Sequence, residues 1–249
     1  MTVKSVNIFK AVTSCFFPNN CLGCGQVLAE DEYFCDYCYN TIEHIQVDKA
    51  CKKCGIPKKH CSCGRYVFHF DASVAPLRND GPAKEAMRKF KFHHKAHYGK
   101  YFAEQMSLMV KQRYMDREFD LIVYVPMSTF AKLKRGYNQS FVLAAKLSEI
   151  LNIPLGNNIL KCKHKTIPQR ELSGKERFKN IKGKFSCNKS LFGKRILLVD
   201  DIKTTGATLD ECSKQLMTHG AESVCCITAL TTYKEKKKEK RKREKSNGN

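Results

Sequence analysis

Apolar positions over residues 67–233 alternate between strand-like and helix-like patterns. Continuous apolar runs at 119–125 and 195–199 predict buried strands, because the strands of a parallel sheet are covered on both faces. Residues 98–113, 139–151 and 208–219 repeat their apolar positions at helical spacing and predict helices. The other predicted elements are an edge strand over 70–77, a helix over 83–92, short strands over 158–162 and 184–187, and a final strand over 223–231. This alternation predicts an α/β fold with a parallel sheet between helices.

Composition divides the chain into three predicted parts. Residues 1–66 hold nine of the fourteen cysteines and few periodic segments, which predicts a small metal-binding module. Residues 67–233 carry the strand–helix alternation, and 234–249 form a polar, basic tail that we expect to be disordered. No stretch has the roughly 20 apolar residues of a membrane helix. Residues 1–17 have no clear cleavage site after them, so we expect a short amphipathic helix there rather than a signal peptide.

The formal net charge is +21, and the excess of lysine and arginine extends beyond the tail. A basic body favours polyanionic partners, which are nucleic acid, phosphorylated ligands or an anionic membrane. A generic basic protein would show the same excess, so charge alone leaves both interpretations open. The clustering of the cysteines and the lack of a signal peptide favour a cytoplasmic location over a secreted, disulfide-linked one.

Eight cysteines form four closely spaced pairs. The candidate metal ligands are Cys21, Cys24, Cys35, Cys38, Cys51, Cys54, Cys61 and Cys63. A Cys-x2-Cys pair places two thiolates on one tight turn, and two such turns supply the four sulfurs of a tetrahedral zinc site. We expect about two structural zinc ions, because four sulfur ligands leave no open position for catalysis. An iron–sulfur cluster would use the same ligands.

The sequence leaves the arrangement of these ligands open. The first pair could close with the second pair, or in cross-braced fashion with the third. Cys61 and Cys63 are separated by one residue only, and His60 could replace one of their thiolates, although a solvated histidine is the simpler interpretation. The later cysteines lie in apolar surroundings and are predicted to be buried structural thiols. They are Cys162, Cys187, Cys212, Cys225 and Cys226.

Around residue 200 the sequence joins an apolar strand, two acids, a loop rich in threonine and glycine, and a helix. Asp200 and Asp201 would lie at the carboxyl end of a parallel strand, where such sheets bind ligands. Paired carboxylates there can accept hydrogen bonds from both hydroxyls of a ribose and orient a hydrated Mg²⁺ ion. The predicted phosphate-binding residues are Thr204, Thr205, Gly206, Ala207 and Thr208. Their N–H groups and hydroxyls would converge on an anion at a helix N-terminus. A plain helix cap with both acids in solvent is the alternative.

Two basic segments flank this predicted site. A basic loop after the strand at 119–125 leads to Arg135 and Gly136. The guanidinium fork of Arg135 matches phosphate oxygens, whereas a solvated basic turn is the alternative interpretation. The polar stretch 161–184 predicts either a mobile lid over the site or an ordinary long loop.

The strand, paired acids and threonine–glycine loop resemble the phosphoribosyl pyrophosphate signature of type I phosphoribosyltransferases. The order of all the motifs over about residues 15–233 resembles the ComF family of competence proteins. The motifs that carry this resemblance are the cysteine pairs, the Arg-Gly-Tyr-Asn-Gln segment at 135–139, the spacing of Gln169, Leu172, Arg177 and Asn180, and the acid-threonine-glycine loop. The resemblance implies a phosphoribosyltransferase-type domain preceded by a zinc-binding module.

The same resemblance assigns roles to residues. It implies that Asp200 and Asp201 bind the ribose hydroxyls, that 204–208 bind the 5′-phosphate, and that the loop carrying Arg135 and Gly136 faces the pyrophosphate. It also implies a cytoplasmic role in natural transformation, at the inner face of the membrane where single-stranded DNA enters. The expected partners are phosphoribosyl pyrophosphate with Mg²⁺, single-stranded DNA and a ComFA-like translocase.

Three functions are compatible with these residues. The leading one is a DNA-uptake factor that uses the phosphoribosyltransferase fold for binding or regulation. The second is a working phosphoribosyltransferase of nucleotide metabolism, and the third is a zinc-finger nucleic-acid-binding module on an inactive scaffold. Lysines, arginines and aromatic residues alternate over 84–101, as single-stranded DNA would require. The core faces of two helices explain those aromatics more simply.

Overall fold

The computed structural model describes all residues except 1–18, 30–31, 93–95, 164–177, 179 and 236–249. The predictions of an N-terminal helix and a disordered tail therefore concern segments outside the described residues, apart from the first two residues of the tail. Most of the predicted lid, including Gln169, Leu172 and Arg177, also lies outside them.

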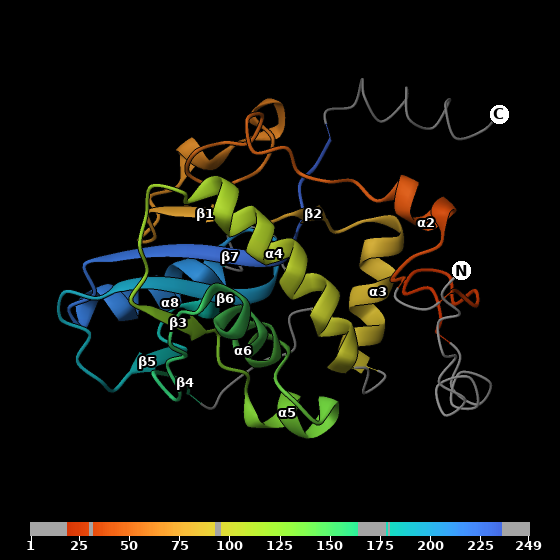
Figure 1. Ribbon diagram of the computed structural model, residues 1–249. Coiled ribbons are helices and arrows are strands. Elements are labelled where there is room, and N and C mark those ends of the chain that lie inside the picture. The colour runs from red at the N-terminus through yellow and green to blue at the C-terminus, as the bar shows by residue number, and fades with distance from the viewer. Residues whose placement is uncertain (1–18, 30–31, 93–95, 164–177, 179, 236–249) are drawn as a thin grey trace, which may run out of the picture.

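A parallel sheet in the order β1-β7-β6-β3 forms the centre of the fold (Figure 1). Its strands are β1 (Ala72–Val74), β2 (Leu77–Arg78), β3 (Leu121–Tyr124), β6 (Arg195–Lys203) and β7 (Ser223–Thr231). The central strands β6 and β7 are mostly buried, which explains their continuous apolar runs. β1 and β2 pair with β7 along one edge, as predicted for 70–77, and they are separated at Pro76, which has no N–H to donate to the ladder.

Helices cover both faces of this sheet. α3 (Gly81–Phe92), α4 (Gly99–Arg113) and α6 (Gln139–Leu151) lie on one face, and α8 (Ala207–Thr218) lies on the other (Figure 1). The strands β4 (Leu160–Cys162) and β5 (Phe185–Cys187) pair antiparallel, and β5 packs against α8. The other elements are α2 (Asp36–Thr41), α5 (Thr129–Arg135) and short 3-10 turns at Lys58–His60, Cys63–Arg65 and Ala96–Tyr98. The predicted α/β class is confirmed. None of the helices in the described part of the chain has the length and apolar character that crossing a bilayer requires.

The segment after β3, predicted as a basic loop, forms the helix α5 instead. The Oγ of Ser128 caps its start by accepting a hydrogen bond from the Ala131 N–H at 3.3 Å. Gly136 ends it with a φ of +80°, a conformation that favours glycine. None of the residues of α5 is buried. Because the helix has no buried apolar face, its sequence lacks the regular apolar spacing that predicts a helix.

The strand predicted over 195–199 also extends further than expected. β6 stays paired with β7 as far as Lys203, which lies opposite Thr231. Asp200 and Asp201 therefore lie within β6 rather than after its end. β3 stops at Tyr124 and does not pair with Asp200 or Asp201, so the side of β6 that faces β3 is open at these two acids.

The cysteine-rich segment packs directly on the α/β part of the chain. The rings of Tyr33 and Phe34 lie against Tyr101 of α4, with centroids 5.2 and 4.9 Å apart. Leu22 and Ile42 belong to the same buried cluster as residues of α3, α4 and the sheet. This shared core means that the segment is held by burial of apolar surface as well as by its cysteines.

Arg78 of β2 joins the cysteine-rich segment to the residues that follow β7. Its guanidinium donates to Glu43 at 2.9 Å and to Glu235, and it lies 4.7 Å from the centre of the Tyr233 ring. Burial acts to lower the pKa of Arg78, but the hydrogen bonds with Glu235 and Glu43 outweigh it and raise the pKa above its ordinary value. The ring of His60 stacks on the same Tyr233 at 5.0 Å.

Gly55 allows the cysteine-rich segment to approach β1 closely. Its φ is +67°, and a Cβ at this position would come within 2.3 Å of the Ser73 carbonyl oxygen. The Ser73 N–H donates to the Lys53 carbonyl at 2.9 Å, so backbone meets backbone at this contact. Only glycine satisfies both the dihedral angle and the close approach.

Replacing Gly55 with alanine should therefore destabilise the protein by at least about 2 kcal/mol, since the added methyl group meets backbone that cannot move aside. Chemical unfolding in excess zinc would measure the change. Gly64→Ala is the matched control, because nothing lies within 4 Å of a Cβ there. Its effect should stay within about 0.5 kcal/mol. Equal stability of the two variants would contradict this account of the contact.

Candidate functional site: two cysteine clusters and an acid pair at the edge of the sheet

The eight candidate metal ligands gather into two groups of four. The first cluster consists of Cys21, Cys24, Cys35 and Cys38, and the second cluster consists of Cys51, Cys54, Cys61 and Cys63. Within each cluster the four sulfurs lie within 4.8 Å of one another. The first pair thus closes with the second pair and not in cross-braced fashion, and His60 is not among the grouped ligands.

The sulfur positions fit a single tetrahedral ion. The Cys21–Cys35 and Cys24–Cys35 distances are both 3.8 Å, and the Cys51–Cys63 distance is 3.7 Å. Four sulfurs about 2.3 Å from a zinc ion are about 3.8 Å apart, whereas disulfide sulfurs are about 2.05 Å apart. One ion can therefore reach all four thiolates of a cluster, and no position remains for a substrate.

Backbone groups prepare these thiols for metal binding. Burial raises the pKa of Cys21, but N–H groups including that of Cys35, which lies 3.4 Å from the sulfur, outweigh it and lower the pKa to about 6. In the second cluster the N–H groups of Cys54 and Lys53 likewise outweigh burial and lower the pKa of Cys51 to about 7. Because the thiolate is the form that binds metal, the first Cys-x2-Cys turn of each cluster, which we call its knuckle, offers one ligand that ionises easily.

The later cysteines take no part in either cluster. Cys187, Cys212, Cys225 and Cys226 are buried, and Cys162 is partly buried. Burial raises the pKa of Cys212 well above its ordinary value. The prediction that these are structural thiols agrees with their positions in the core.

Asp200 and Asp201 lie at the carboxyl half of β6, next to the first turn of α6. The Ser140 hydroxyl donates to Asp200 Oδ1 at 2.8 Å, and the backbone N–H of Asp201 donates to the same oxygen at 2.9 Å. Burial raises the pKa of Asp200 to about 7, and the neighbouring charge of Asp201 acts in the same direction. Asp200 is thus poised between its neutral and ionised forms near neutral pH.

Lys91 of α3 provides the counter-charge of the pair. Its ammonium lies 2.8 Å from Asp201 Oδ2, and both side chains are largely shielded from solvent, with 16% and 13% of their surfaces exposed. The sequence does not connect Lys91 with the acids, which are more than a hundred residues away. Nor did it single out Ser140, although that residue directly follows the Arg-Gly-Tyr-Asn-Gln segment.

The threonine–glycine loop connects β6 to α8. Gly206 has a φ of +86° and is the N-terminal cap of α8, without a side-chain cap bond. Thr205 Oγ1 accepts from the Ala207 N–H at 3.4 Å, and Thr204 is exposed. Part of the capping alternative is therefore real, because Thr205 does cap a backbone group. The other part of that alternative, in which both acids lie in solvent, does not apply, because Asp200 and Asp201 are both partly buried.

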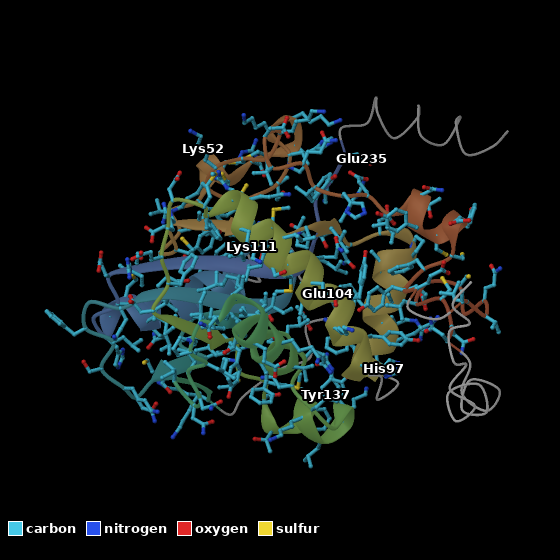
Figure 2. The ribbon with its side chains drawn as sticks, in the orientation of Figure 1. Lys52, His97, Glu104, Lys111, Tyr137 and Glu235 are labelled. Carbon is cyan, nitrogen blue, oxygen red and sulfur yellow. The ribbon has the colours of Figure 1, made fainter. Side chains whose placement is uncertain are left out.

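The Arg-Gly-Tyr-Asn-Gln segment fixes the start of α6 beside the acids. Asn138 caps α6 by accepting from the Ser140 N–H at 3.0 Å, and its amide donates to the Val125 carbonyl at 3.1 Å. The hydroxyl of Tyr137, which is labelled in Figure 2, donates to the Phe90 carbonyl near the end of α3. These bonds place Ser140 against Asp200.

Arg135 lies at the end of α5, on the side of α3. Its guanidinium lies 5.3 Å from the centre of the Phe92 ring and donates to Gln139 Oε1 at 3.2 Å. Within the part of the chain that the structure describes, neither of these two contacts pairs the charge of Arg135 with a carboxylate. Gly136 has no side chain to contribute and serves as the C-cap of α5.

The chain matches two domain families, the phosphoribosyl transferase domain over residues 138–247 and the double zinc ribbon domain over residues 12–67. It is 33% identical to Competence protein F of Haemophilus influenzae, over 84% of this chain and 95% of that protein. This chain belongs to the ComF family. Competence protein ComFC of Bacillus subtilis is 30% identical over 82% of this chain and 86% of its own length. DNA utilization protein YhgH of Escherichia coli is 27% identical over 83% and 94%.

These matches confirm the predicted fold class, a phosphoribosyltransferase-type domain preceded by a zinc-binding module. The zinc ribbon match and the two cysteine clusters together identify zinc as the metal rather than an iron–sulfur cluster. The acids and the threonine–glycine loop fall within the matched phosphoribosyl transferase domain, whereas Arg135 and Gly136 precede it.

Two zinc ions per chain are expected in the purified protein, one in each cluster. Cys24→Ser and Cys54→Ser should each reduce the zinc content by one ion, because a site with three sulfurs binds zinc more weakly. Elemental analysis of the purified variants measures the content directly. Cys162→Ser is the control and should keep both ions. A folded native protein without zinc would refute this assignment of the clusters.

The raised pKa of Asp200 makes stability depend on pH. The folded state holds the proton of Asp200 up to a pKa of about 7, while an unfolded Asp releases it near its ordinary pKa of 3.8. The stabilisation is therefore complete below the unfolded pKa and is lost as the pH rises through about 7. Relative to Asp200→Asn, the native protein should lose about 1 kcal/mol of unfolding free energy between about pH 6 and about pH 8.

Chemical unfolding of both proteins at the two pH values measures that difference. Asp116→Asn serves as the control, because Asp116 is exposed and should behave like the native protein. A constant difference between the native protein and Asp200→Asn across this pH range would show that Asp200 titrates normally.

Proposed function

We propose that this ComF-family protein acts in the cytoplasm in the uptake of single-stranded DNA during natural transformation, and that its phosphoribosyltransferase-type domain binds phosphoribosyl pyrophosphate with Mg²⁺. Support for the first part comes from the relatives named for competence and DNA utilization. Support for the second comes from the acid pair, which the fold brings together with Lys91, Ser140 and the threonine–glycine loop. In this proposal a ComFA-like translocase delivers the DNA at the inner side of the membrane.

Each group has a chemical task in this proposal. Asp200 and Asp201 accept hydrogen bonds from the ribose hydroxyls and orient Mg²⁺, which neutralises charge on the pyrophosphate when bound. The segment 204–208 binds the 5′-phosphate through its N–H groups and hydroxyls. Arg135, which directly precedes the Gly136 cap of α5, would bind the pyrophosphate, because the guanidinium fork matches its oxygens. The ammonium of Lys91 compensates the acid pair until the ligand arrives.

The working enzyme is a second candidate, favoured by the aromatic cluster next to the loop. The rings of Tyr66 and Phe178 are stacked at 5.0 Å, and those of Phe68 and Phe70 at 4.6 Å. A Cβ on Gly206 would lie 3.4 Å from the Phe68 ring, so this cluster borders the loop. A planar base could stack there and accept the ribose. Release of pyrophosphate from phosphoribosyl pyrophosphate on addition of a base, with transfer of the ribosyl group to that base, would favour this candidate.

Binding of Mg-phosphoribosyl pyrophosphate, measured by calorimetry, tests the proposal. Replacing both Asp200 and Asp201 with Asn should weaken binding by at least about 100-fold, because each hydrogen bond to a charged group contributes about 1.5–3 kcal/mol. Asp48→Asn with Asp116→Asn is the matched control, since both residues are exposed and the same two charges are removed. Its affinity should equal that of the native protein.

Two results would refute the proposal. One is equal affinity of the native protein and the Asp200/Asp201 variant. The other is the absence of binding by a folded native protein that carries both zinc ions. In the second case the DNA-uptake role would have to rest on the zinc module, as in the third hypothesis from the sequence.

A further inference from the structure

Lys203 is a buried cation at the junction of β6 and the threonine–glycine loop. Only 4% of its surface is exposed, although it directly precedes Thr204 in the chain. A buried ammonium is costly unless hydrogen bonds replace its water. Lys203 obtains two of them, since its Nζ donates to the Cys54 carbonyl and to the Ser73 hydroxyl, the latter at 2.9 Å.

Both acceptors belong to the contact between the second cluster and the sheet. Cys54 is a ligand of that cluster, and Ser73 lies on β1, where its N–H donates to the Lys53 carbonyl. Gly55 packs against the same stretch of β1. Lys203 thus links the start of the loop to the knuckle of the second cluster. At this place the backbone is already held by the hydrogen bond between Ser73 and Lys53.

The knuckle reaches the loop by a second path, through Phe68 and Phe70. The Lys53 ammonium donates to the carbonyls of both residues and lies 5.4 Å from the centre of the Phe70 ring. The Phe68 ring in turn borders Gly206. The second cluster therefore supports the loop both before Thr204 and at Gly206.

We propose that zinc in the second cluster and an anionic ligand on the 204–208 loop bind cooperatively, with Lys203 as the positioning residue that links the two sites. The ligand half of this inference rests on the proposed function. A knuckle without zinc is free to change shape, and the Cys54 carbonyl would then no longer hold Lys203 in place. By thermodynamic linkage, the ligand must raise the affinity for this zinc by the same factor by which zinc raises the affinity for the ligand, and we expect the tighter binding to slow the release of the ion.

Lys203→Met tests the link, since methionine keeps the apolar stem and removes the donor. Zinc transfer to a chromogenic chelator and calorimetric binding of Mg-phosphoribosyl pyrophosphate are the two measurements. We expect about tenfold faster release of one of the two zinc ions and about tenfold weaker ligand binding, the effect of losing hydrogen bonds from a charged donor. In the native protein the ligand should slow the release of that same ion.

Lys89→Met is the matched control. Lys89 donates to the carbonyl of Gly23, between Cys21 and Cys24, at 2.9 Å. Lys89 therefore binds a backbone carbonyl in the knuckle of the first cluster, as Lys203 does in the knuckle of the second. Loss of this bond should speed the release of one zinc ion without changing the affinity for the ligand. Ser73→Ala is a milder variant for the case in which Lys203→Met does not fold, and it should shift both measurements in the same direction by a smaller factor.

The outcomes separate the two proposals. If the native protein binds the ligand and both Lys203→Met and Ser73→Ala retain native zinc release and native affinity, the link is refuted. If Lys89→Met weakens ligand binding as much as Lys203→Met, the effect is general and the link is again refuted. If the native protein does not bind the ligand, the proposed function fails, while faster zinc release from Lys203→Met would still support its contact with the knuckle.

Discussion

Pairing of β6 with β7 continues past the point where β3 ends, and much of the rest of the structure depends on this extension. The pairing holds the backbone of β6 in place as far as Lys203, while its other side is open beyond Tyr124. Two acidic residues can therefore sit in a rigid strand and still face a ligand. A site on a paired strand is held more firmly than a site on a loop, because the ladder of hydrogen bonds fixes its backbone.

The acids are costly in this position, and their neighbours show how the cost is reduced. Asp200 receives hydrogen bonds from Ser140 and from the next backbone N–H, and Asp201 receives the Lys91 ammonium. Even so, burial raises the pKa of Asp200. Strain of this electrostatic kind is typical of residues that serve a function rather than stability.

The zinc module has a structural role toward the site, as its contacts show. It shares a hydrophobic core with α3 and α4, and it touches β1 and the end of β6 through Gly55 and Lys203. The small segment could not fold on burial of its own apolar surface alone, so zinc and the neighbouring domain stabilise it together. The second cluster thereby contacts, through a hydrogen bond, the residue that directly precedes the proposed phosphate loop.

The sequence by itself determined the α/β class, the eight cysteines, the acid pair and its loop. These features depend on local periods and short spacings, which are visible along the chain. The extent of β6 and the helical state of 129–135 could not be predicted, since the first depends on the partner strand β7 and the second buries no apolar face. The contacts of Lys91 with Asp201, Ser140 with Asp200 and Lys203 with Cys54 join residues 60 to 149 positions apart. Only the tertiary structure could bring them together, because no local pattern records which distant groups will share a buried charge.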